Sequence, residues 1–328
     1  MGVPAKISVV ICTYNRCKTL GAAIESIAAQ TLPQSLGWEI LVVDNNSTDE
    51  TRQLVESIQR RYPERIRYIF EPKQGLSNAR NTGIREARGE ILVFLDDDEI
   101  ASSGWVENLT ANLHSGEWAG AGGRVLPPSS FSPPRWLSAL NSSLAGPLAV
   151  FDPALEAGQL TEPPFGANMA FRREVFDKYG GFRTDLGRAG RNMISNEDTE
   201  FGRRLIGVGL RLRYEPSALT YHPVEESRLH PSYFLSWWFN KGRSDVREFG
   251  NQSNRTRLIG IPLRLFRALP WATMRWMGAI EPPRRFGYKL EVWSCAGQIF
   301  ESYQLWLDAK RKGPERNSKS CPPVKRGG

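Results

Sequence analysis

Four consecutive carboxylates, Asp96, Asp97, Asp98 and Glu99, follow directly on the apolar run 91–95. An apolar run without alternation predicts a strand buried on both faces, as in a parallel sheet covered by helices. Open α/β sheets bind ligands outside the carboxyl ends of such strands, and neighbouring carboxylates repel one another unless a cation lies between them. We therefore expect a divalent cation, Mn²⁺ or Mg²⁺, whose coordination is completed by phosphate oxygens and water. The alternative is a solvated acidic turn in which Asp97 or Glu99 caps the next helix.

The carboxylates belong to a regular alternation of strands and helices in the first third of the chain. Turn residues separate the apolar runs, and Ser47 with Glu50 predicts a capping box at the start of one helix. We predict strands at 7–13, 39–43, 66–70 and 91–95, and helices at 18–30, 47–61 and 76–87. This βαβαβαβ order is typical of a doubly wound sheet with right-handed crossovers. The sequence contains neither G-x-G-x-x-G nor G-x-x-x-x-G-K-[ST], so it shows no dinucleotide fingerprint and no P-loop.

Polar side chains also follow the first two predicted strands. A carboxylate at a strand end can accept the imide N–H of uracil or thymine, and a tyrosine ring offers a base a surface for stacking. The residues concerned are Thr13, Tyr14, Asn15 and Arg16 after the first strand and Asp44 after the second. Together they predict the two halves of a nucleotide site. The alternatives are an Asx-turn or capping role for Asp44 and an ordinary rim position for Tyr14.

The middle of the chain continues the α/β pattern around a long irregular segment. Residues 127–165 are rich in proline and show little periodicity, which predicts a loop over the site that forms a lid or a substrate wall. We predict helices at 103–114, 172–179 and 196–207, and strands at 118–125, 165–171 and around Leu219.

The composition is that of a globular protein with an uneven charge distribution. The chain has 328 residues, of which 40% are hydrophobic, enough for a core of about 200 to 250 residues with a smaller appendage. Residues 1–240 carry 25 Lys and Arg against 28 Asp and Glu, whereas residues 241–328 carry 18 against 7. A nucleic-acid enzyme would carry basic residues around its cleft, and the predicted cleft here is neutral to acidic, so we expect no nucleic-acid partner.

Cysteine and hydropathy patterns indicate a cytoplasmic location. The four cysteines form no C-x-x-C pair and are too few for a disulfide framework. The first apolar run is too short for a signal peptide, and no segment offers about 18 uninterrupted apolar residues. We expect a cytoplasmic protein whose contact with a membrane, if it has one, is peripheral and on the inner face of the cell membrane.

Four motifs, in this order and spacing, resemble those of the family 2 glycosyltransferases. They are TYNR at 13–16, VVDNNSTD at 42–49, GLSNARNTGI at 75–84 and FLDDDE at 94–99. The resemblance covers residues 5–225. It implies an α/β fold of the GT-A nucleotide-sugar-binding type, with a doubly wound and mostly parallel sheet, over residues 1–230. It also implies transfer with inversion at the anomeric carbon.

The resemblance further implies how a nucleotide-sugar donor, most readily a UDP-sugar, would be bound. Tyr14 and Asp44 would hold the base, and Arg80 would reach it from the third helix. Asp96 would contact the ribose and Asp98 the metal-bound diphosphate. The predicted donor site also includes Thr13, Asn15, Arg16 and Asp97.

On the acceptor side, the resemblance assigns the general base to Asp198. Such a base must lie within hydrogen-bond reach of the acceptor hydroxyl that it deprotonates. The alternative is a capping box formed by Ser195 and Asp198. His222 would bind the metal beside Asp98, although a lone histidine is otherwise more often structural. The remaining predicted members of the acceptor or sugar pocket are Gly166, Ala167, Asn168 and Glu197.

Residues 231–309 differ from the rest of the chain because they are rich in tryptophan and arginine. Within 258–280 a helical wheel separates an apolar side from the arginines, which predicts a helix at an anionic membrane surface, split by Pro270. The apolar side comprises Leu265, Phe266, Leu269, Met274, Trp276, Met277 and Ile280, and the basic side Arg264, Arg267 and Arg275. The alternative is an amphipathic helix packed on the core. Residues 310–328 are predicted to be a disordered basic tail.

The sequence thus predicts a metal-dependent, inverting glycosyltransferase that moves a sugar from a nucleotide-sugar donor to an acceptor hydroxyl. A lipid-linked glycan in cell-surface polysaccharide assembly is the favoured acceptor, and soluble acceptors stay open. One alternative is a nucleotidyltransferase of related fold, although TYNRCKTLG lacks the phosphate loop expected of one. Another is a non-catalytic nucleotide- or membrane-binding scaffold, which the intact set of acidic residues disfavours.

Overall fold

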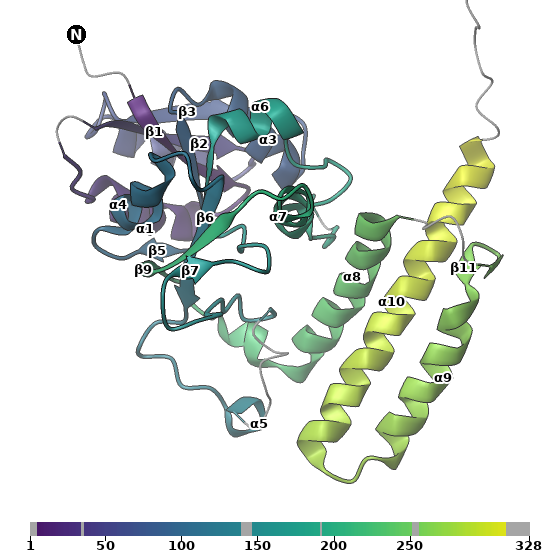
Figure 1. Cartoon of the computed structure of the whole chain (residues 1–328). Coiled ribbons are helices and arrows are strands. Elements are labelled where there is room, and N and C mark those ends of the chain that lie inside the picture. Colours follow the sequence, from purple (N-terminus) through teal and green to yellow (C-terminus); the bar gives the residue numbers. More distant parts are fainter. Residues whose placement is uncertain (1–4, 34–35, 139–145, 191, 251–255, 313–328) are drawn as a thin grey trace, which may run out of the picture.

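The computed structural model describes residues 5–33, 36–138, 146–190, 192–250 and 256–312. Within these residues a nine-stranded sheet is covered by helices on both faces, and three long helices pack against one another to one side of it (Figure 1). The strand order is β3-β2-β1-β4-β8-β6-β9-β5, with β7 paired to β9. The predicted α/β architecture is therefore confirmed.

The first half of the sheet is parallel and doubly wound, as the βαβ pattern requires. Its elements are β1 Ala5–Thr13, α1 Cys17–Ala28, β2 Gly37–Asp44, α2 Thr51–Gln59, β3 Ile66–Phe70, α3 Leu76–Glu86 and β4 Ile91–Asp96. Strand β1 pairs in parallel with both β2 and β4, so that Thr13 lies opposite Asp44, and Cys12 lies opposite Asp96. This register brings the polar strand ends to one edge of the sheet.

The second half of the sheet is mixed, because β8 runs antiparallel between β4 and β6. Its elements are β5 Ile100–Ala101, α4 Trp105–Thr110, η1 Ala111–Leu113, β6 Gly120–Leu126, α5 Arg135–Ser138, β7 Gly158–Gln159, β8 Asn168–Arg172, α6 Arg173–Tyr179, α7 Glu197–Gly207, β9 Leu212–Tyr221 and η3 Glu226–Leu229. The segment predicted as one loop over 127–165 contains α5 and β7, and its residues 139–145 lie outside the described residues.

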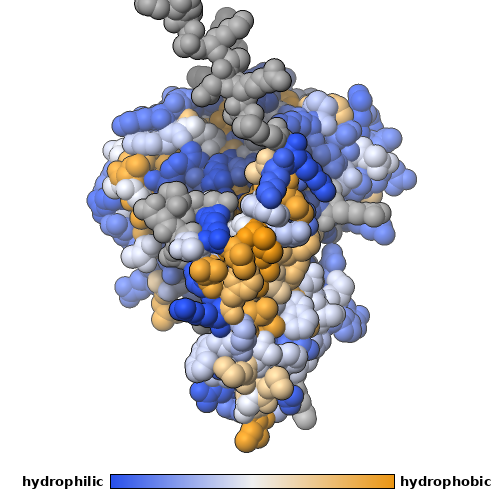
Figure 2. Space-filling model, turned by 90° about the vertical axis from the view of Figure 1, so that its right-hand side faces the viewer, coloured by the Kyte–Doolittle hydropathy of each residue, from blue (hydrophilic) through white to orange (hydrophobic). Residues whose placement is uncertain are grey.

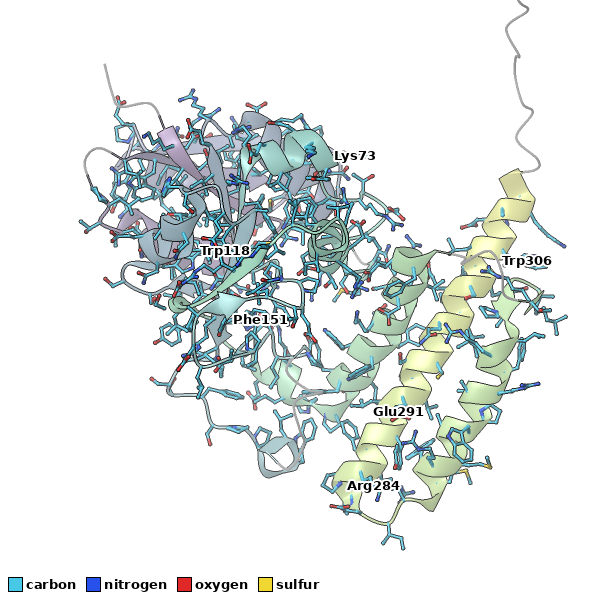
Figure 3. The ribbon with its side chains drawn as sticks, in the orientation of Figure 1. Lys73, Trp118, Phe151, Arg284, Glu291 and Trp306 are labelled. Carbon is cyan, nitrogen blue, oxygen red and sulfur yellow. The ribbon has the colours of Figure 1, made fainter. Side chains whose placement is uncertain are left out.

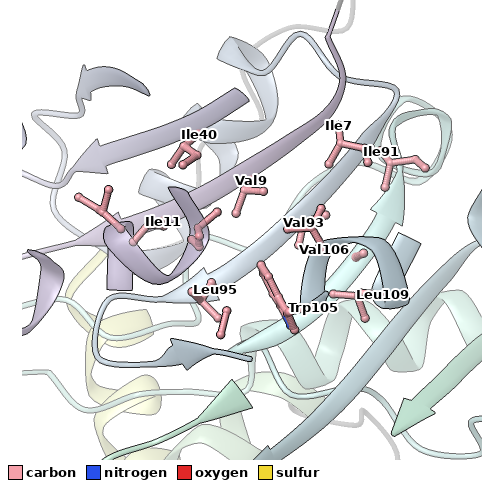
Figure 4. Close-up of a cluster of buried hydrophobic side chains, with 14 of the residues drawn as sticks. Ile7, Val9, Ile11, Ile40, Ile91, Val93, Leu95, Trp105, Val106 and Leu109 are labelled. Carbon is pink, nitrogen blue, oxygen red and sulfur yellow. The ribbon is translucent and has the colours of Figure 1, made fainter. Parts of the chain in front are cut away.

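The core consists of two apolar layers, one on each face of the sheet. Strands β1 and β4 are apolar on both faces because successive side chains alternate and both faces are covered. On one face, β1 and β4 pack against Trp105 and its neighbours on α4 (Figure 4). On the other, a cluster of phenylalanines joins β4 and β8 to α6 and α7. These layers hold the strand ends and α7 in fixed positions.

Neither predicted capping box forms. Helix α2 begins at Thr51 because the Asp49 carboxylate accepts the backbone N–H of that residue, while the backbone N–H of Ser47 donates to Asp44. Helix α7 is preceded by Asn196, whose backbone is left-handed at φ 75°. The Asp198 side chain is therefore not part of a cap made by Ser195.

The C-terminal region consists of three packed helices and a short hairpin. They are α8 Pro231–Phe249, β10 Arg257–Leu258, β11 Ile261–Pro262, α9 Leu263–Gly278 and α10 Pro282–Lys312. Helix α10 lies between α8 and α9 (Figure 1). Two glycines allow α8 and α10 to touch, since a Cβ on Gly242 would lie 2.1 Å from the Ser294 carbonyl oxygen and one on Gly297 would lie 1.9 Å from that of Phe239.

Two predictions for this region are wrong in part. Pro270 stays inside a continuous helix α9 and does not split it. Helix α10 continues through Lys312, so only residues 313–328 of the predicted tail lie outside the described residues.

Along α10, Glu291 accepts a hydrogen bond from Arg275 of α9 at 2.9 Å, and Figure 3 shows it between these two helices. Among the described residues, no helix is both long enough and apolar enough to cross a bilayer.

The predicted apolar side of α9 is also distributed differently in space. Leu265 is buried, whereas Phe266, Met274, Met277 and Ile280 are exposed. Two apolar residues outside the predicted set, Leu263 and Trp271, are exposed as well. We call these six exposed side chains the α9 apolar stripe; they are Leu263, Phe266, Trp271, Met274 and Met277 on α9 and Ile280 just after its end.

Candidate active site

A cavity of about 360 Å³ opens at the carboxyl ends of the parallel strands, between the sheet edge, α7 and α8. Of the predicted site residues, those that line it are Arg80, Asp96, Asp98, Gly166, Ala167, Glu197, Asp198 and His222. They come from five separate segments of the chain. The fold thus gathers the predicted base, both predicted metal ligands and three of the nine predicted donor residues around one space.

The carboxylate of Asp198 is held in one orientation by two backbone groups. Its Oδ2 accepts the N–H of Gly166 at 2.6 Å, and its Oδ1 accepts the N–H of Thr199 at 2.7 Å. It also lies in the first turn of α7, where the helix dipole favours negative charge. A carboxylate fixed in this way at the wall of a cavity has the geometry that a general base needs.

Arg80 links the sheet edge to α7. Its guanidinium donates to Glu197 Oε1 at 2.7 Å, to Asp96 Oδ1 at 3.2 Å and to the Gly166 carbonyl oxygen at 3.1 Å. The residue is only 3% exposed, so these partners compensate a buried charge. Burial, together with the charge of Asp198, raises the pKa of Glu197, and Arg80 opposes that rise. The Arg80 guanidinium lies against Asp96 and α7, and its contact with the nucleotide base stays a prediction.

Asp98 and His222 lie close together in the lining of the cavity, with 3.7 Å between Asp98 Oδ2 and His222 Nε2. Arg228 contacts both, at 3.5 Å from Asp98 Oδ2 and 3.0 Å from His222 Nε2. Because arginine only donates, Nε2 must present its lone pair. Burial raises the pKa of Asp98, and the positive charges of Arg228 and Arg16 oppose that rise and favour the ionised carboxylate.

This donor set fits a divalent cation that is bound together with a diphosphate. An anionic carboxylate oxygen and an imidazole nitrogen lie 3.7 Å apart, and both are ligands that Mn²⁺ accepts. The described residues contain no cluster of three or more His, Cys, Asp or Glu side chains able to hold a metal. Two protein ligands leave most coordination positions to phosphate oxygens and water, as is usual for Mg²⁺ in nucleotide sites.

At the nucleotide end, Asp44 is almost fully buried and already accepts two hydrogen bonds. The backbone N–H of Ser47 donates to one carboxylate oxygen at 2.9 Å and the Tyr68 hydroxyl donates to the other at 2.7 Å. Tyr14 beside it is 37% exposed. The arrangement keeps both the Asx-turn role of Asp44 and a role in base binding open, since a carboxylate can accept about four hydrogen bonds.

The other predicted donor residues have mixed surroundings. Asn15 connects two loops, because its side chain accepts the backbone N–H of Thr48 at 2.7 Å. The buried hydroxyl of Thr13 makes no hydrogen bond of ordinary geometry among the described residues, although the Asp97 carboxylate lies close to it. Arg16 lies between Asp98, at 3.7 Å, and Glu225, at 3.3 Å. Burial raises the pKa of Asp97 to about 7.

Asn168 and Glu99 do not line the cavity. The carboxamide of Asn168 is fully buried, accepts from the Trp105 indole at 2.9 Å and donates to the Ala218 carbonyl oxygen at 2.8 Å. Its predicted place in the acceptor pocket is therefore wrong, because the side chain bridges strands in the core. Glu99 is fully buried, and neither of its carboxylate oxygens has a partner among the described residues.

The cavity also contains residues that sequence reasoning missed. Arg228 follows the predicted ligand His222 by six residues, so a basic residue near that motif was the available signal. Trp237 and Lys241 come from α8, which was assigned to a separate region beginning at 231. Their periodicity is that of an ordinary packed helix, so nothing local marked them. The missed lining residues include Arg188, Asn196, Arg228, Trp237 and Lys241.

Helix α8 is joined to the start of α7 by polar contacts. Asn196 donates to Glu248 at 2.6 Å and to Asp245 at 3.0 Å, and Lys241 donates to Asn196 at 3.0 Å. The backbone N–H of Ser195 donates to a hydroxyl of α8 as well. The C-terminal region therefore supports the segment that carries Asp198.

Comparisons with known proteins bear on the family of this chain. The sequence model of the family described as Glycosyl transferase family 2 matches residues 8–180. The succinoglycan biosynthesis protein ExoM of Rhizobium meliloti is 27% identical over 254 residues, which cover 76% of this chain and 77% of that protein. The GalNAc(5)-diNAcBac-PP-undecaprenol beta-1,3-glucosyltransferase of Campylobacter jejuni is 37% identical over 113 residues, 34% of this chain and 35% of that protein.

The fold is found in a solved structure as well. The mannosyltransferase PcManGT from Pyrobaculum calidifontis, in complex with GDP-Man and Mn²⁺, has a TM-score of 0.63 at 20% identity, and the match covers 92% of this chain and 90% of that one. At this identity the likeness shows the fold alone. The family match sets aside the nucleotidyltransferase and scaffold alternatives. The chain belongs to glycosyl transferase family 2 and is an inverting glycosyltransferase with the GT-A fold.

Proposed function

We propose that this cavity binds a nucleotide sugar, most readily a UDP-sugar, with a divalent cation and transfers the sugar to an acceptor hydroxyl by way of Asp198. The observation that carries the proposal is the Asp198 carboxylate, fixed at 2.6 Å from the Gly166 N–H in the same cavity as Asp96, Asp98 and His222. A base and a diphosphate site in one space are what an inverting transfer requires.

On the donor side, Asp98 and His222 would hold the cation, and Asp96 would bind the ribose. The cation supplies neutralising charge for the diphosphate as it leaves. Arg80 keeps Asp96 and Glu197 in place through its buried ion pairs. Thr13, Tyr14 and Asp44 would bind the base.

On the acceptor side, Asp198 takes the proton of the acceptor hydroxyl as its oxygen attacks the anomeric carbon. The new bond joins that carbon to the acceptor oxygen, and the bond from the same carbon to the diphosphate oxygen breaks with its electron pair. Attack from the face opposite the leaving group inverts the configuration. The two backbone N–H groups that hold Asp198 orient its free lone pairs.

The acceptor we favour is a lipid-linked glycan at an anionic membrane surface. The Campylobacter relative is named for an undecaprenol-linked acceptor. In this chain, the α9 apolar stripe has exposed fractions from 43% for Phe266 to 95% for Ile280. Figure 2 views this side of the molecule and shows hydrophobic residues gathered in a patch with hydrophilic residues around it. An exposed apolar stripe with arginines beside it suits a helix that lies in a membrane interface.

The donor assignment is tested by calorimetric titration of UDP, GDP, dTDP and CMP, with and without Mn²⁺, into the wild type and Asp98→Ala. We expect one nucleotide to bind in a manganese-dependent way, and the variant to lose that binding. If folded wild-type protein binds none of the four, the donor site is misassigned.

The base assignment is tested with Asp198→Asn, which keeps the shape of the side chain and removes its basicity. We expect transfer to fall by about 10²- to 10⁴-fold, the usual contribution of a general base. Binding of the nucleotide should be unchanged. A variant that loses nucleotide binding instead would show that Asp198 acts structurally.

The membrane assignment is tested by co-sedimentation with vesicles of phosphatidylglycerol and phosphatidylcholine. We expect wild-type protein to bind the anionic vesicles, and the double variant Met274→Gln/Met277→Gln to bind about tenfold more weakly because the stripe loses apolar area. Leu155→Gln is the matched control, since Leu155 is 87% exposed but lies outside the stripe. Equal binding of the double variant and the control would disprove the assignment.

A further inference from the structure

Arg228 is a buried cation with poor partners. It lies in η3 and is 9% exposed. Among the described residues its guanidinium contacts only Asp98 at 3.5 Å and His222 at 3.0 Å. A guanidinium has five N–H donors, and hydrogen bonds between ions are normally about 2.7–2.9 Å long. The side chain lines the cavity, so its remaining donors face the space where a ligand would bind.

The two contacts of Arg228 are the two groups that would hold the metal. Asp98 Oδ2 lies 3.5 Å from Arg228, 3.7 Å from Arg16 and 3.7 Å from His222. The Nε2 lone pair of His222 faces the Arg228 guanidinium. A guanidinium and a divalent cation at this one position would repel each other strongly in such a buried place. Arg228 must therefore move away from the pair when a cation binds there.

A diphosphate would give Arg228 better partners than it has now. Arginine binds phosphate oxygens through two parallel hydrogen bonds, which is stronger than a long contact to one carboxylate oxygen and one neutral imidazole. The long side chain can make this change by rotating about its own bonds. The backbone of η3 can stay where it is, joined to the first strand end by the ion pair between Arg16 and Glu225 at 3.3 Å.

We propose that Arg228 binds the diphosphate of the donor and, until the donor arrives, neutralises the Asp98–His222 pair and disfavours binding of the metal alone. This inference rests on the proposed donor site. It predicts that metal and nucleotide bind together, because the diphosphate draws Arg228 away from the position that the cation takes. One residue thus has opposite effects on the two ligands.

The test is Arg228→Gln, measured by binding and not by turnover. Titration of Mn²⁺ alone into the variant should show an affinity about tenfold higher than in the wild type, because a competing positive charge is gone. Titration of UDP at saturating Mn²⁺ should show an affinity at least about 30-fold lower, the usual result of truncating a buried charge pair. UMP lacks the second phosphate and should lose much less. GDP and GMP are run in parallel.

Three results would overturn the proposal: both affinities unchanged, both reduced, or UMP weakened as much as UDP. If the wild type itself binds neither diphosphate, the proposed donor site fails, and this inference fails with it. If the wild type binds UDP and the variant binds it with the same affinity, only the role of Arg228 is refuted. The two failures are therefore distinguishable.

Two further variants keep the test valid if Arg228→Gln folds poorly. Arg228→Lys keeps the charge but cannot form a two-pronged contact, so it should lie between wild type and Arg228→Gln in both titrations. Arg213→Gln is the control, because Arg213 is a half-buried arginine paired with Glu215 at 3.3 Å and is not a cavity residue. It should match the wild type in both titrations.

Discussion

Two regions depart in opposite ways from the usual arrangement of side chains. One is the sheet edge that carries the site, and the other is helix α9. At the sheet edge, charged residues are buried: Arg80 is 3% exposed and Glu197 is 4% exposed. On α9, large apolar residues are exposed, with Met277 at 72%. A buried charge costs free energy unless it is paired, so Arg80 and Glu197 depend on partners inside the chain. An exposed apolar stripe costs solubility unless something covers it, so the second region points to a partner outside the chain.

Between these two regions, α8 belongs to both. It packs along α10, and it also supplies Trp237 and Lys241 to the cavity and contacts the start of α7. The comparison therefore has a testable form. Changes at the sheet edge should cost stability and chemistry together, changes at the α7–α8 junction should cost some of both, and changes on α9 should cost neither.

The largest effect is expected for Arg80→Met. The substitution leaves Glu197 buried without its partner, which should lower the free energy of unfolding by about 3–5 kcal/mol. Urea denaturation measures this loss as a lower midpoint concentration. The slope of the free energy of unfolding against urea concentration should be unchanged. Arg52→Met is the control, because Arg52 pairs with Glu56 on the surface, where its side chain is 68% exposed, and the midpoint should not move. Equal midpoints for the two variants would mean that the buried network is not what stabilises this edge.

A smaller effect is expected at the junction, for Glu248→Gln. Glu248 is buried, accepts from Asn196 and pairs with Arg203. Weakening these contacts should lower the free energy of unfolding by about 2 kcal/mol, as for hydrogen bonds to a buried charged group. The turnover rate should also fall while nucleotide binding stays the same, because Asn196 immediately precedes the helix of Asp198.

The control for Glu248→Gln is Glu291→Gln, which removes a surface ion pair between Glu291 of α10 and Arg275 of α9. It should leave the denaturation midpoint and the turnover rate unchanged. A loss of nucleotide affinity in Glu248→Gln would argue against the separation of donor and acceptor sides.

Gly166→Ala should cost less stability but much activity. Its new Cβ would lie 2.6 Å from Arg80 Nη2 and 2.9 Å from Asp198 Oδ2. Overpacking of this kind costs about 1–3 kcal/mol, and displacing the base should lower the turnover rate by about 10²-fold. Gly158→Ala is the control, because a Cβ there meets nothing within 4 Å. Normal turnover in Gly166→Ala would show that the position of Asp198 tolerates movement.

The smallest effect is expected for Met277→Gln on α9. Because the side chain is already exposed, the free energy of unfolding should change by less than about 0.5 kcal/mol. Thermal denaturation measures this directly. A large loss of stability would mean that Met277 packs against other parts of the chain in solution, and the stripe would then not be available to a membrane.

Much of the fold and about half of the site could be predicted because they depend on local order along the chain. Uninterrupted apolar runs, each followed by polar residues, predict that Thr13, Asp44 and Asp96 lie at strand ends. A parallel register then brings those ends together. The capping prediction at Ser47 failed because the Asp49 carboxylate accepts the N–H at the start of α2, and the one at Ser195 failed because the left-handed Asn196 precedes α7. Which residue caps a helix thus depends on the conformation of the loop before it.

The sequence by itself determined the family, the α/β order and the acidic strand end, since these depend on motifs of fewer than about ten neighbouring residues. Only the tertiary structure decided that Arg80 pairs with Glu197, that Asn168 faces the core, that Arg228 lies against the predicted metal ligands and that α8 forms a wall of the cavity. The physical reason is that a buried polar group takes whichever partner the packing of distant segments brings within about 3 Å. No local pattern specifies that partner.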